Sequence, residues 1–257
     1  IMSFSYKIVA FDLDGTLAES KQPLGLEVAE LLFKLAKTLP VVIISGGSEL
    51  QFEKQFISQW KKLVPQVPEV NKNLILLSTS GTQDYEYDKE NDSWKEVYKA
   101  EFPEDKKQAV KKFLEEMITS GKYDIPSEHE GEYVEDRGTQ ITFSACGQNA
   151  SIEKKKGWDP SREKRRKMKA VLESHFPDLG ISIGGMTSID ILTKGFTKAV
   201  GLKMLLQRKG LEERDLIFVG DAFYPGGNDR SVMDAGIKSV QVSGPRETAE
   251  IIKGWFS

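Results

Sequence analysis

Short, mostly apolar runs alternate with longer amphipathic stretches along the first third of this chain. The runs at 6–11, 41–44 and 74–77 are predicted to be buried strands. Between them, residues 26–39 and 48–63 carry apolar side chains at helical spacing, which predicts helices. Strands that alternate with helices indicate a parallel sheet covered on both faces. Ligands bind such sheets outside the carboxyl ends of the strands.

The middle third has more antiparallel character. Residues 85–87 and 94–98 flank a polar segment, which predicts a β-hairpin with an exposed tip. Residues 104–119 and 161–176 have the spacing of amphipathic helices. Short apolar segments in the same region predict further strands, near 141–143, 181–183 and 189–191.

Parallel-sheet character returns near the end of the chain, with strands predicted at 216–219 and 237–242. We therefore expect an α/β fold whose core is interrupted by an inserted α+β domain. The core would comprise residues 1–83 and 187–257, and the inserted domain residues 84–186.

Composition limits the class of protein. The chain has 257 residues, a net charge of −3 and one cysteine, Cys146. A single cysteine fits a protein of a reducing cytoplasm. The negative net charge argues against nonspecific binding of nucleic acid. The first apolar run is too short for a secretory signal, because Asp12 interrupts it. No run approaches the ~20 apolar residues of a membrane helix. We expect a cytoplasmic protein without a membrane partner.

Two carboxylates stand where the first strand ends. Asp12 and Asp14 lie one residue apart in Asp-Leu-Asp-Gly-Thr, and alternate residues of an extended chain point to the same side. Converging carboxylates repel each other unless a cation compensates, so we expect them to bind a divalent ion, Mg²⁺. Taken alone, the pair could also be an ordinary strand-to-loop turn.

Other polar residues follow the later apolar runs. Ser45 and Gly46 come directly after the second strand, and Asp221 follows the strand at 216–219. Asp229 closes the glycine-rich segment that begins at Pro225. Ser45 alone could be a helix cap, since Ser-Gly-Gly-Ser precedes a predicted helix.

These ordered motifs resemble those of the haloacid-dehalogenase (HAD) superfamily, and the inserted domain resembles that of subclass IIB. The resemblance implies that Asp12 is the nucleophile and Asp14 the general acid and base. It implies that Asp12, the main-chain carbonyl of Asp14, Asp221 and Asp229 hold Mg²⁺. It also implies phosphate contacts from further residues: Ser45, Gly46 and Lys198.

Within this subclass, the tail is similar to eukaryotic-type phosphomannomutases, through Gly184-Gly185, Ser188-x-Asp190, Lys198 and Pro-Gly-Gly-Asn-Asp at 225–229. The resemblance implies that Ser188 and Asp190 contact a sugar phosphate, although ordinary strand alternation would also place polar residues there. One arginine of the family's inserted domain is kept, Arg137.

Other arginines of that family are replaced here: Gln148, Glu130 and Lys21 fall near their positions. Neither glutamine nor glutamate offers the bidentate fork of arginine to a phosphate. We therefore expect a Mg²⁺-dependent sugar-phosphate phosphatase, with phosphomannomutase as the alternative.

The expected partner is a small phosphorylated metabolite. A homodimer formed through the inserted domain is left open. A nucleic-acid-binding protein that uses the basic segment at 154–169 is an alternative of another class, although acidic residues interspersed in that segment favour a solvated surface.

Overall fold

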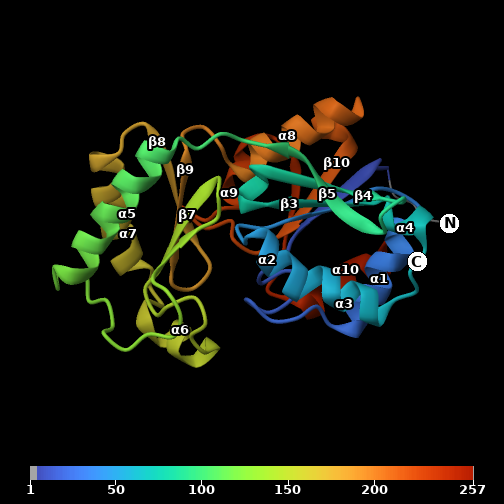
Figure 1. Ribbon diagram of the computed structural model, residues 1–257. Helices are drawn as coiled ribbons and strands as arrows, with labels where there is room; N and C mark the ends of the chain where they lie inside the picture. Colours follow the sequence, from blue (N-terminus) through green and yellow to red (C-terminus); the bar gives the residue numbers. More distant parts are fainter. Residues whose placement is uncertain (1–4, 257) are drawn as a thin grey trace. The chain divides into compact units, whose positions relative to one another are not determined.

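The computed structural model describes residues 5–256. The chain divides into two units, each described here by itself (Figure 1). The core unit comprises the described residues up to Lys99 and from Thr197 onwards, and the inserted unit comprises Ala100–Phe196. An α/β fold with a mostly parallel sheet and an inserted α+β unit is the fold class predicted from the sequence.

The core unit is built on a seven-stranded sheet with the order β11-β10-β1-β2-β3-β4-β5. Five strands are parallel: β1 (Ile8–Asp12), β2 (Val41–Ile44), β3 (Leu74–Ser78), β10 (Leu216–Gly220) and β11 (Lys238–Gln241). The four that precede β11 in the chain are buried along their whole length, which explains their nearly unbroken apolar sequences.

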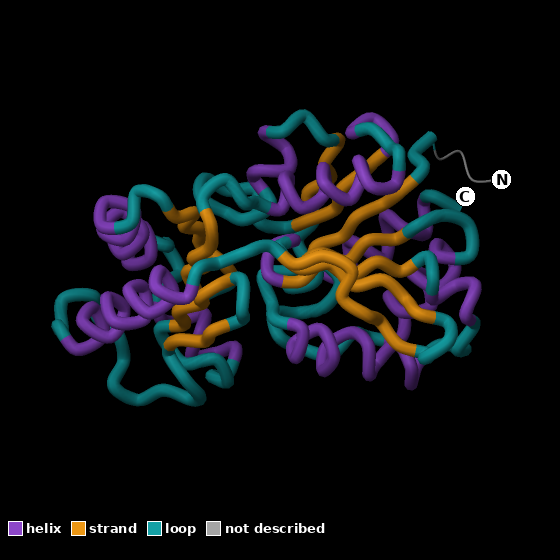
Figure 2. The backbone as a smooth tube through the Cα atoms, turned by 45° about the horizontal axis from the view of Figure 1, so that its top comes forward, coloured by secondary structure: helices purple, strands orange, loops and turns teal. Residues whose placement is uncertain are grey.

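Helices cover both faces of this sheet, as the purple and orange segments of the core unit in Figure 2 show. Val9 and Phe11 of β1 pack with α1 (Leu26–Ala36) and α10 (Pro245–Gly254), whereas Ile8 and Ala10 pack with the other layer. That other layer contains α8 (Lys198–Lys209) and α9 (Arg230–Asp234). The core unit also contains three short helical elements: α4 (Pro68–Asn71), η2 (Thr79–Gly81) and η3 (Glu213–Asp215).

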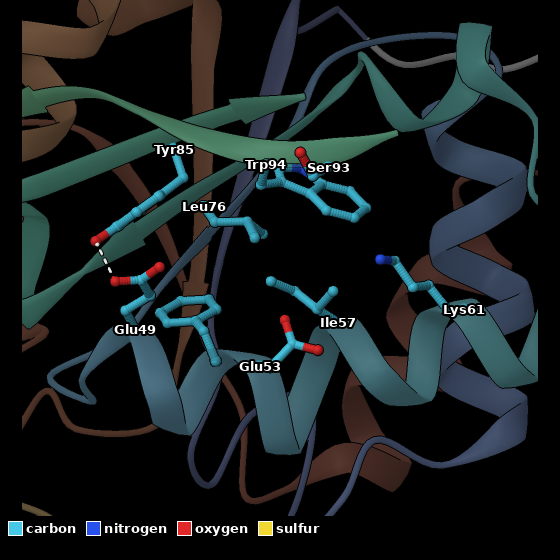
Figure 3. A pocket seen from close by; sticks show the side chains of 9 residues that line it. Glu49, Glu53, Ile57, Lys61, Leu76, Tyr85, Ser93 and Trp94 are labelled. Carbon is cyan, nitrogen blue, oxygen red and sulfur yellow. Dashed lines mark hydrogen bonds between the residues drawn. The ribbon is translucent and has the colours of Figure 1, made fainter. Parts of the chain in front are cut away.

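The helix predicted at 48–63 forms as one run with an irregular middle. It consists of α2 (Glu49–Phe52), a π-helical turn η1 (Glu53–Ile57) and α3 (Ser58–Leu63). One face of this run lies opposite the sheet across a cavity of about 90 Å³, and the hydroxyl of Tyr85 donates to Glu49 there (Figure 3). The run is thereby fixed against the antiparallel end of the sheet.

The inserted unit is a four-stranded antiparallel sheet, with the order β6-β7-β9-β8, and three helices. The strands are β6 (Val134–Asp136), β7 (Gln140–Ser144), β8 (Leu179–Gly184) and β9 (Ser188–Thr193). The helices are α5 (Glu104–Thr119), α6 (Ile152–Trp158) and α7 (Glu163–His175). Apolar residues of α5 and α7 pack on one face of the sheet, against the alternate residues of β7 and β9.

The boundaries differ from the predicted ones at 83/84 and 186/187. The predicted hairpin forms as β4 (Gln83–Asp88) and β5 (Ser93–Lys99), but β4 pairs with β3, so the hairpin belongs to the core sheet. Conversely, β9 pairs with β7 and β8 and belongs to the inserted unit. An alternating sequence predicts a strand but not its partner, and parallel sheets often carry an antiparallel edge.

No helix within residues 5–256 is both long and apolar enough to cross a membrane.

Candidate active site

The carboxyl ends of three neighbouring parallel strands carry polar residues that the sequence singled out. β1 ends at Asp12, and its neighbours β10 and β2 lead directly into Asp221 and Ser45. Asp12 pairs with Ile44, the residue before Ser45, so these two strands end at the same level. Such an edge is where α/β proteins bind their ligands.

Asp12, Asp221 and Asp229 form a carboxylate cluster, in which one oxygen of each residue lies within 4.8 Å of the others. Asp12 and Asp229 are buried, and Asp221 is partly exposed. The backbone N–H groups of Asp221 and Ala222 donate to Oδ2 of Asp229 at 3.1 and 2.9 Å, which fixes that carboxylate in the turn after β10. Oxygen ligands of this kind suit a hard divalent cation.

Lys198 is buried beside the carboxylate cluster. Its Nζ contacts Oδ1 of Asp12 and lies 2.7 Å from Oδ1 of Asp229. Burial favours the neutral amine, but the two carboxylates together raise the pKa of Lys198 above its usual value, so the side chain stays an ammonium group. One cation thus faces three carboxylates, and negative charge remains in excess.

Loss of hydration, together with this excess of negative charge, changes the pKa values of two of the carboxyl groups. Burial raises the pKa of Asp12 well above its ordinary value, even though Lys198 opposes the change. Burial, together with repulsion from Asp229, raises the pKa of Asp221 to about 6. A bound divalent cation would supply the missing positive charge. The carboxylate cluster therefore fits Mg²⁺, with the main-chain carbonyl of Asp14 as a further predicted ligand.

Small residues let these carboxylates approach the backbone. Gly15 has φ +85°, and a Cβ atom there would lie 2.7 Å from Oδ2 of Asp221. A Cβ atom on Gly220 would lie 2.5 Å from Oδ2 of Asp229. Any larger side chain would displace a carboxylate of the cluster, which gives a physical reason for glycine at both positions.

The segment after β2 is a tight loop. Ser45 is buried, and its Oγ accepts the N–H of Gly47 at 2.9 Å. The helix that follows is capped by Ser48, whose Oγ accepts the N–H of Gln51 at 3.3 Å, so Ser45 is not the cap. Gly46 lies between the two serines, in the position predicted for a phosphate contact.

Asp14 is not part of the carboxylate cluster. The strand ends at Asp12, so the alternation that was expected to bring the two side chains to one ligand does not continue. The carboxylate of Asp14 instead accepts hydrogen bonds from the N–H of Lys21 at 2.6 Å and from the amide groups of Gln51 and Gln55 at 3.1 and 2.9 Å.

The two glutamines were missed by the sequence reasoning. They lie four residues apart on the run α2–η1–α3, which the sequence presented as a helix recognised by its apolar face. A pair of amides at i and i+4, one turn after the predicted phosphate loop, was the available signal.

In the inserted unit, Ser188 and Asp190 are alternate residues of β9 on the same face of the sheet, next to β7. Oγ of Ser188 lies 2.9 Å from Oγ of Ser144, and Oδ1 of Asp190 accepts the hydroxyl of Thr142 at 2.8 Å. A Cβ atom on Gly184 would lie 2.5 Å from Oδ2 of Asp190. These polar side chains line the sheet face opposite to the apolar core of the unit.

Arg137 is held by its neighbours in the inserted unit. Its guanidinium donates to Glu135 at 2.7 and 2.9 Å and to Oε1 of Gln148 at 3.5 Å. Glu130 accepts from Nζ of Lys154 at 2.8 Å. Gln148 and Glu130, two of the three residues near positions of family arginines, therefore each contact a cation of the inserted unit, Arg137 and Lys154 respectively.

Several cations of the basic segment are also engaged within the inserted unit. Buried Arg165 pairs with Asp159 at 2.9 Å. The other ion pairs that involve this segment join Lys154 to Glu130, Lys164 to Asp124 and Lys169 to Glu173. These pairs favour a structural explanation of the charge over a nucleic-acid surface.

Solved structures share this fold. An IMP-bound IMP-nucleotidase of Plasmodium falciparum has a TM-score of 0.71 at 16% identity, over 99% of this chain and 69% of that chain. A haloacid dehalogenase-like hydrolase of Bacteroides thetaiotaomicron has a TM-score of 0.59 at 16% identity, over 97% and 99% of the two chains. Similarity at such low sequence identity shows only that the fold is shared.

Sequence comparison is more specific. The chain is 28% identical to the phosphomannomutase of Schizosaccharomyces pombe over 99% of this chain and 96% of that protein. It is 29% identical to the phosphomannomutase of Saccharomyces cerevisiae over 100% and 99%. The family described as eukaryotic phosphomannomutase matches residues 28–257. The chain therefore belongs to the eukaryotic phosphomannomutase family, within the HAD superfamily of phosphotransferases.

Proposed function

We propose that this chain is a Mg²⁺-dependent phosphomannomutase that interconverts the 1- and 6-phosphates of a hexose. The observation that carries the proposal is the site around Asp12, with Asp221, Asp229 and Lys198, in a chain that aligns with proteins of that name over nearly their whole length. The substrate would be a small phosphorylated sugar.

The chemistry would proceed in two balanced steps. An oxygen of Asp12 attacks the phosphorus of a hexose bisphosphate, and Asp14 gives its proton to the departing sugar oxygen, so that an aspartyl phosphate forms. In the second step, the free hydroxyl of a hexose monophosphate, at the carbon that carries no phosphate, attacks this phosphorus, Asp14 takes the hydroxyl proton, and Asp12 leaves as a carboxylate, so that the bisphosphate forms again. Removing the phosphate from the other carbon of this bisphosphate then converts a 1-phosphate into a 6-phosphate. Retaining the phosphate on Asp12 between the two steps is what separates a mutase from a phosphatase.

The other residues of the core unit would stabilise charge. Lys198 and the hydroxyl of Ser45 would neutralise the phosphoryl oxygens, where negative charge spreads in the transition state. Mg²⁺, when bound, would polarise the same phosphoryl group. Asp229 orients the cluster through its bonds to Lys198 and to the turn after β10.

The loss of arginines from the inserted unit suggested a phosphatase, but two contacts weaken that argument. The charge of Glu130 is compensated by Lys154 at 2.8 Å, so Glu130 need not repel a phosphate. Gln148 contacts Arg137, so this glutamine supports a cation of the unit. Together with the similarity to phosphomannomutases, these contacts favour the mutase.

The deciding experiment follows mannose 1-phosphate with and without a hexose bisphosphate activator and measures hexose 6-phosphate and inorganic phosphate in parallel. We expect formation of the 6-phosphate to exceed phosphate release at least tenfold and to depend on the activator. The Asp12→Asn variant is the control for both products. If release of phosphate is the main reaction, the protein is a sugar-phosphate phosphatase and not a mutase.

A further inference from the structure

The carboxylate of Asp14 is surrounded by an ordered set of donors to which the mechanism has so far given no role. Oδ1 accepts two hydrogen bonds, from the N–H of Lys21 at 2.6 Å and from Nε2 of Gln55 at 2.9 Å. Oδ2 accepts one, from Nε2 of Gln51 at 3.1 Å. Since each carboxylate oxygen has two lone pairs, Oδ1 is saturated and Oδ2 keeps one site open.

The two glutamines also bind each other and the loop after β1. Nε2 of Gln51 donates to Oε1 of Gln55 at 2.8 Å, and Nε2 of Gln55 donates to the carbonyl of Gln22 at 3.0 Å. The same loop supplies the N–H of Lys21, whose φ of +58° is rare for a residue other than glycine. A closed network therefore joins Asp14, its own loop and the helix.

The π-helical turn contributes to this network. In η1 the N–H of Ser58 bonds to the carbonyl of Glu53, five residues before it, which loosens the regular ladder of the helix. Within the turn, the carbonyl of Gln55 accepts the N–H of Leu24 at 2.9 Å. Gln55 thus anchors the loop through its backbone as well as its side chain, and π-turns are frequent at functional sites.

The opposite side of the same run is fixed to the sheet. Figure 3 shows Glu49, Glu53, Ile57 and Lys61 along the face that lies toward the strands, with the hydroxyl of Tyr85 donating to Glu49 at 3.2 Å. The two glutamines are each two residues from a member of this row, which places them on another side of the helix. The helix is therefore a fixed support from which the amides reach Asp14.

We propose that Gln51 and Gln55 are positioning residues for Asp14, so that proton exchange with the sugar oxygen takes place at Oδ2. Gln55 holds Oδ1 in place, and Gln51 orients Oδ2 while leaving one lone pair free. Amide side chains suit this task because they stay neutral and keep their donors at every working pH. The inference rests on the proposed role of Asp14 as acid and base.

This role affects some leaving groups and not others. A sugar oxygen leaves poorly without a proton, whereas p-nitrophenolate leaves unaided. Formation of the aspartyl phosphate from p-nitrophenyl phosphate is seen as a pre-steady-state burst. This burst therefore measures the attack by Asp12 independently of proton transfer from Asp14. Misplacing a catalytic group by about 1 Å costs on the order of 100-fold, so the sugar reaction should fall by that order while the burst stays within about twofold.

The test compares Gln51→Ala and Gln55→Ala with Gln59→Ala, a glutamine of the same helical run that is not one of the hydrogen-bond donors to Asp14. We expect both test variants to lose kcat on the hexose phosphate with little change in KM and to keep the burst, and the Gln59 variant to resemble the wild type. Gln55 is buried, so folding is checked by circular dichroism. If that variant fails to fold, partly exposed Gln51 decides the test.

Equal losses of the sugar reaction and the burst would show a merely structural role, and no loss in either would show no role; both outcomes overturn the inference. Asp14→Asn separates this inference from the proposed function. If that variant keeps full turnover of the sugar, the acid–base role of Asp14 fails. If it loses the sugar reaction selectively but the glutamine variants do not, only the positioning role fails.

Discussion

At the scale of single residues, the site is dominated by three carboxyl groups that lie close together, with one oxygen of each within 4.8 Å of the others. Loss of hydration raises the pKa values of buried Asp12 and of partly exposed Asp221, and repulsion from Asp229 raises both further. One buried ammonium group, on Lys198, offsets only part of this charge. A proton and a divalent cation are therefore alternative ways to stabilise the cluster.

This competition predicts the effect of pH on metal binding. The pKa of Asp221 is raised from an ordinary value of 3.8 to about 6 in the folded protein. A pKa raised by folding stabilises the folded protein at pH values below 3.8, and this contribution is lost as the pH rises through about 6. Mg²⁺ should replace the proton above this window, so it should raise the Tm more at about pH 7.5 than at about pH 5. Thermal unfolding with and without Mg²⁺ measures the difference, and Asp221→Asn should reduce it. Equal shifts at both pH values would contradict the metal assignment.

Asp12→Asn should abolish turnover and leave the fold intact. The amide cannot attack phosphorus at a useful rate, and loss of a covalent nucleophile costs several orders of magnitude, roughly 10³-fold or more. Activity on a hexose phosphate and circular dichroism measure the two effects. Residual activity above about one per cent of the wild type would assign the nucleophile to another residue.

At the scale of elements, the basic segment at 154–169 contains a buried cation, Arg165 of α7, that stabilises the fold. The guanidinium of Arg165 is buried, pairs with Asp159 at 2.9 Å, and donates to the carbonyls of Gly184 and Gly185 at 3.3 and 2.7 Å. It therefore ties the start of α7 to the turn that follows β8. Losing it would leave a buried charge and two carbonyls without this donor.

Arg165→Ala should consequently destabilise the inserted unit by about 3–5 kcal/mol, since the carboxylate of Asp159 would be buried without its partner. The neighbouring residue Arg166 is exposed, and Arg166→Ala should stay within about 0.5 kcal/mol. Urea unfolding of the two variants gives the comparison. Similar small losses in both would mean that Asp159 is satisfied by its remaining donors.

Elements were predictable where local sequence decides them. β2 and α5 begin and end at the predicted residues, because unbroken apolar runs and helical spacing are local signals. The sheets to which β4 and β9 belong were not predictable, because a strand's partner is fixed by backbone pairing with distant segments. The π-helical turn η1 was not predicted either, and its Gln55 accepts the N–H of Leu24, a residue far away in the chain.

The site shows the same division. The positions of Asp12, Ser45 and Asp221 at strand ends could be predicted because each closes or follows an apolar run. The glutamines that hold Asp14 were missed, because on an amphipathic helix a pair of amides at i and i+4 that has a partner looks much the same as a solvated pair. The expected convergence of Asp12 and Asp14 failed for a related reason, since alternation applies only as far as the strand extends.

At the scale of the whole molecule, the proposal assigns different tasks to the two units. The groups assigned to phosphoryl transfer all lie in the core unit, whereas the residues with a predicted sugar-phosphate contact, Arg137, Ser188 and Asp190, lie in the inserted unit. A change in the inserted unit should therefore alter recognition of the sugar and leave the reactivity of Asp12 unchanged.

Arg137→Ala tests this division. Arg137 is the family arginine that this unit keeps, and Glu135 and Gln148 orient its guanidinium. The variant should raise KM for a hexose phosphate by about 10- to 100-fold, since a hydrogen bond to a charged group contributes roughly 1.5–3 kcal/mol. The burst with p-nitrophenyl phosphate, which has no second phosphate or sugar to recognise, should be unchanged.

Arg137→Lys is the matched control, because it keeps the charge but loses the planar fork. If bidentate recognition of phosphate matters, the lysine variant should recover only part of the lost affinity for a hexose bisphosphate. Full recovery would mean that charge alone suffices, which would also explain how Lys21 can stand near the position of a family arginine. Equal losses on the sugar and the aryl substrate would instead make Arg137 a structural partner of Glu135, and recognition of the sugar would then have to come from Ser188 and Asp190.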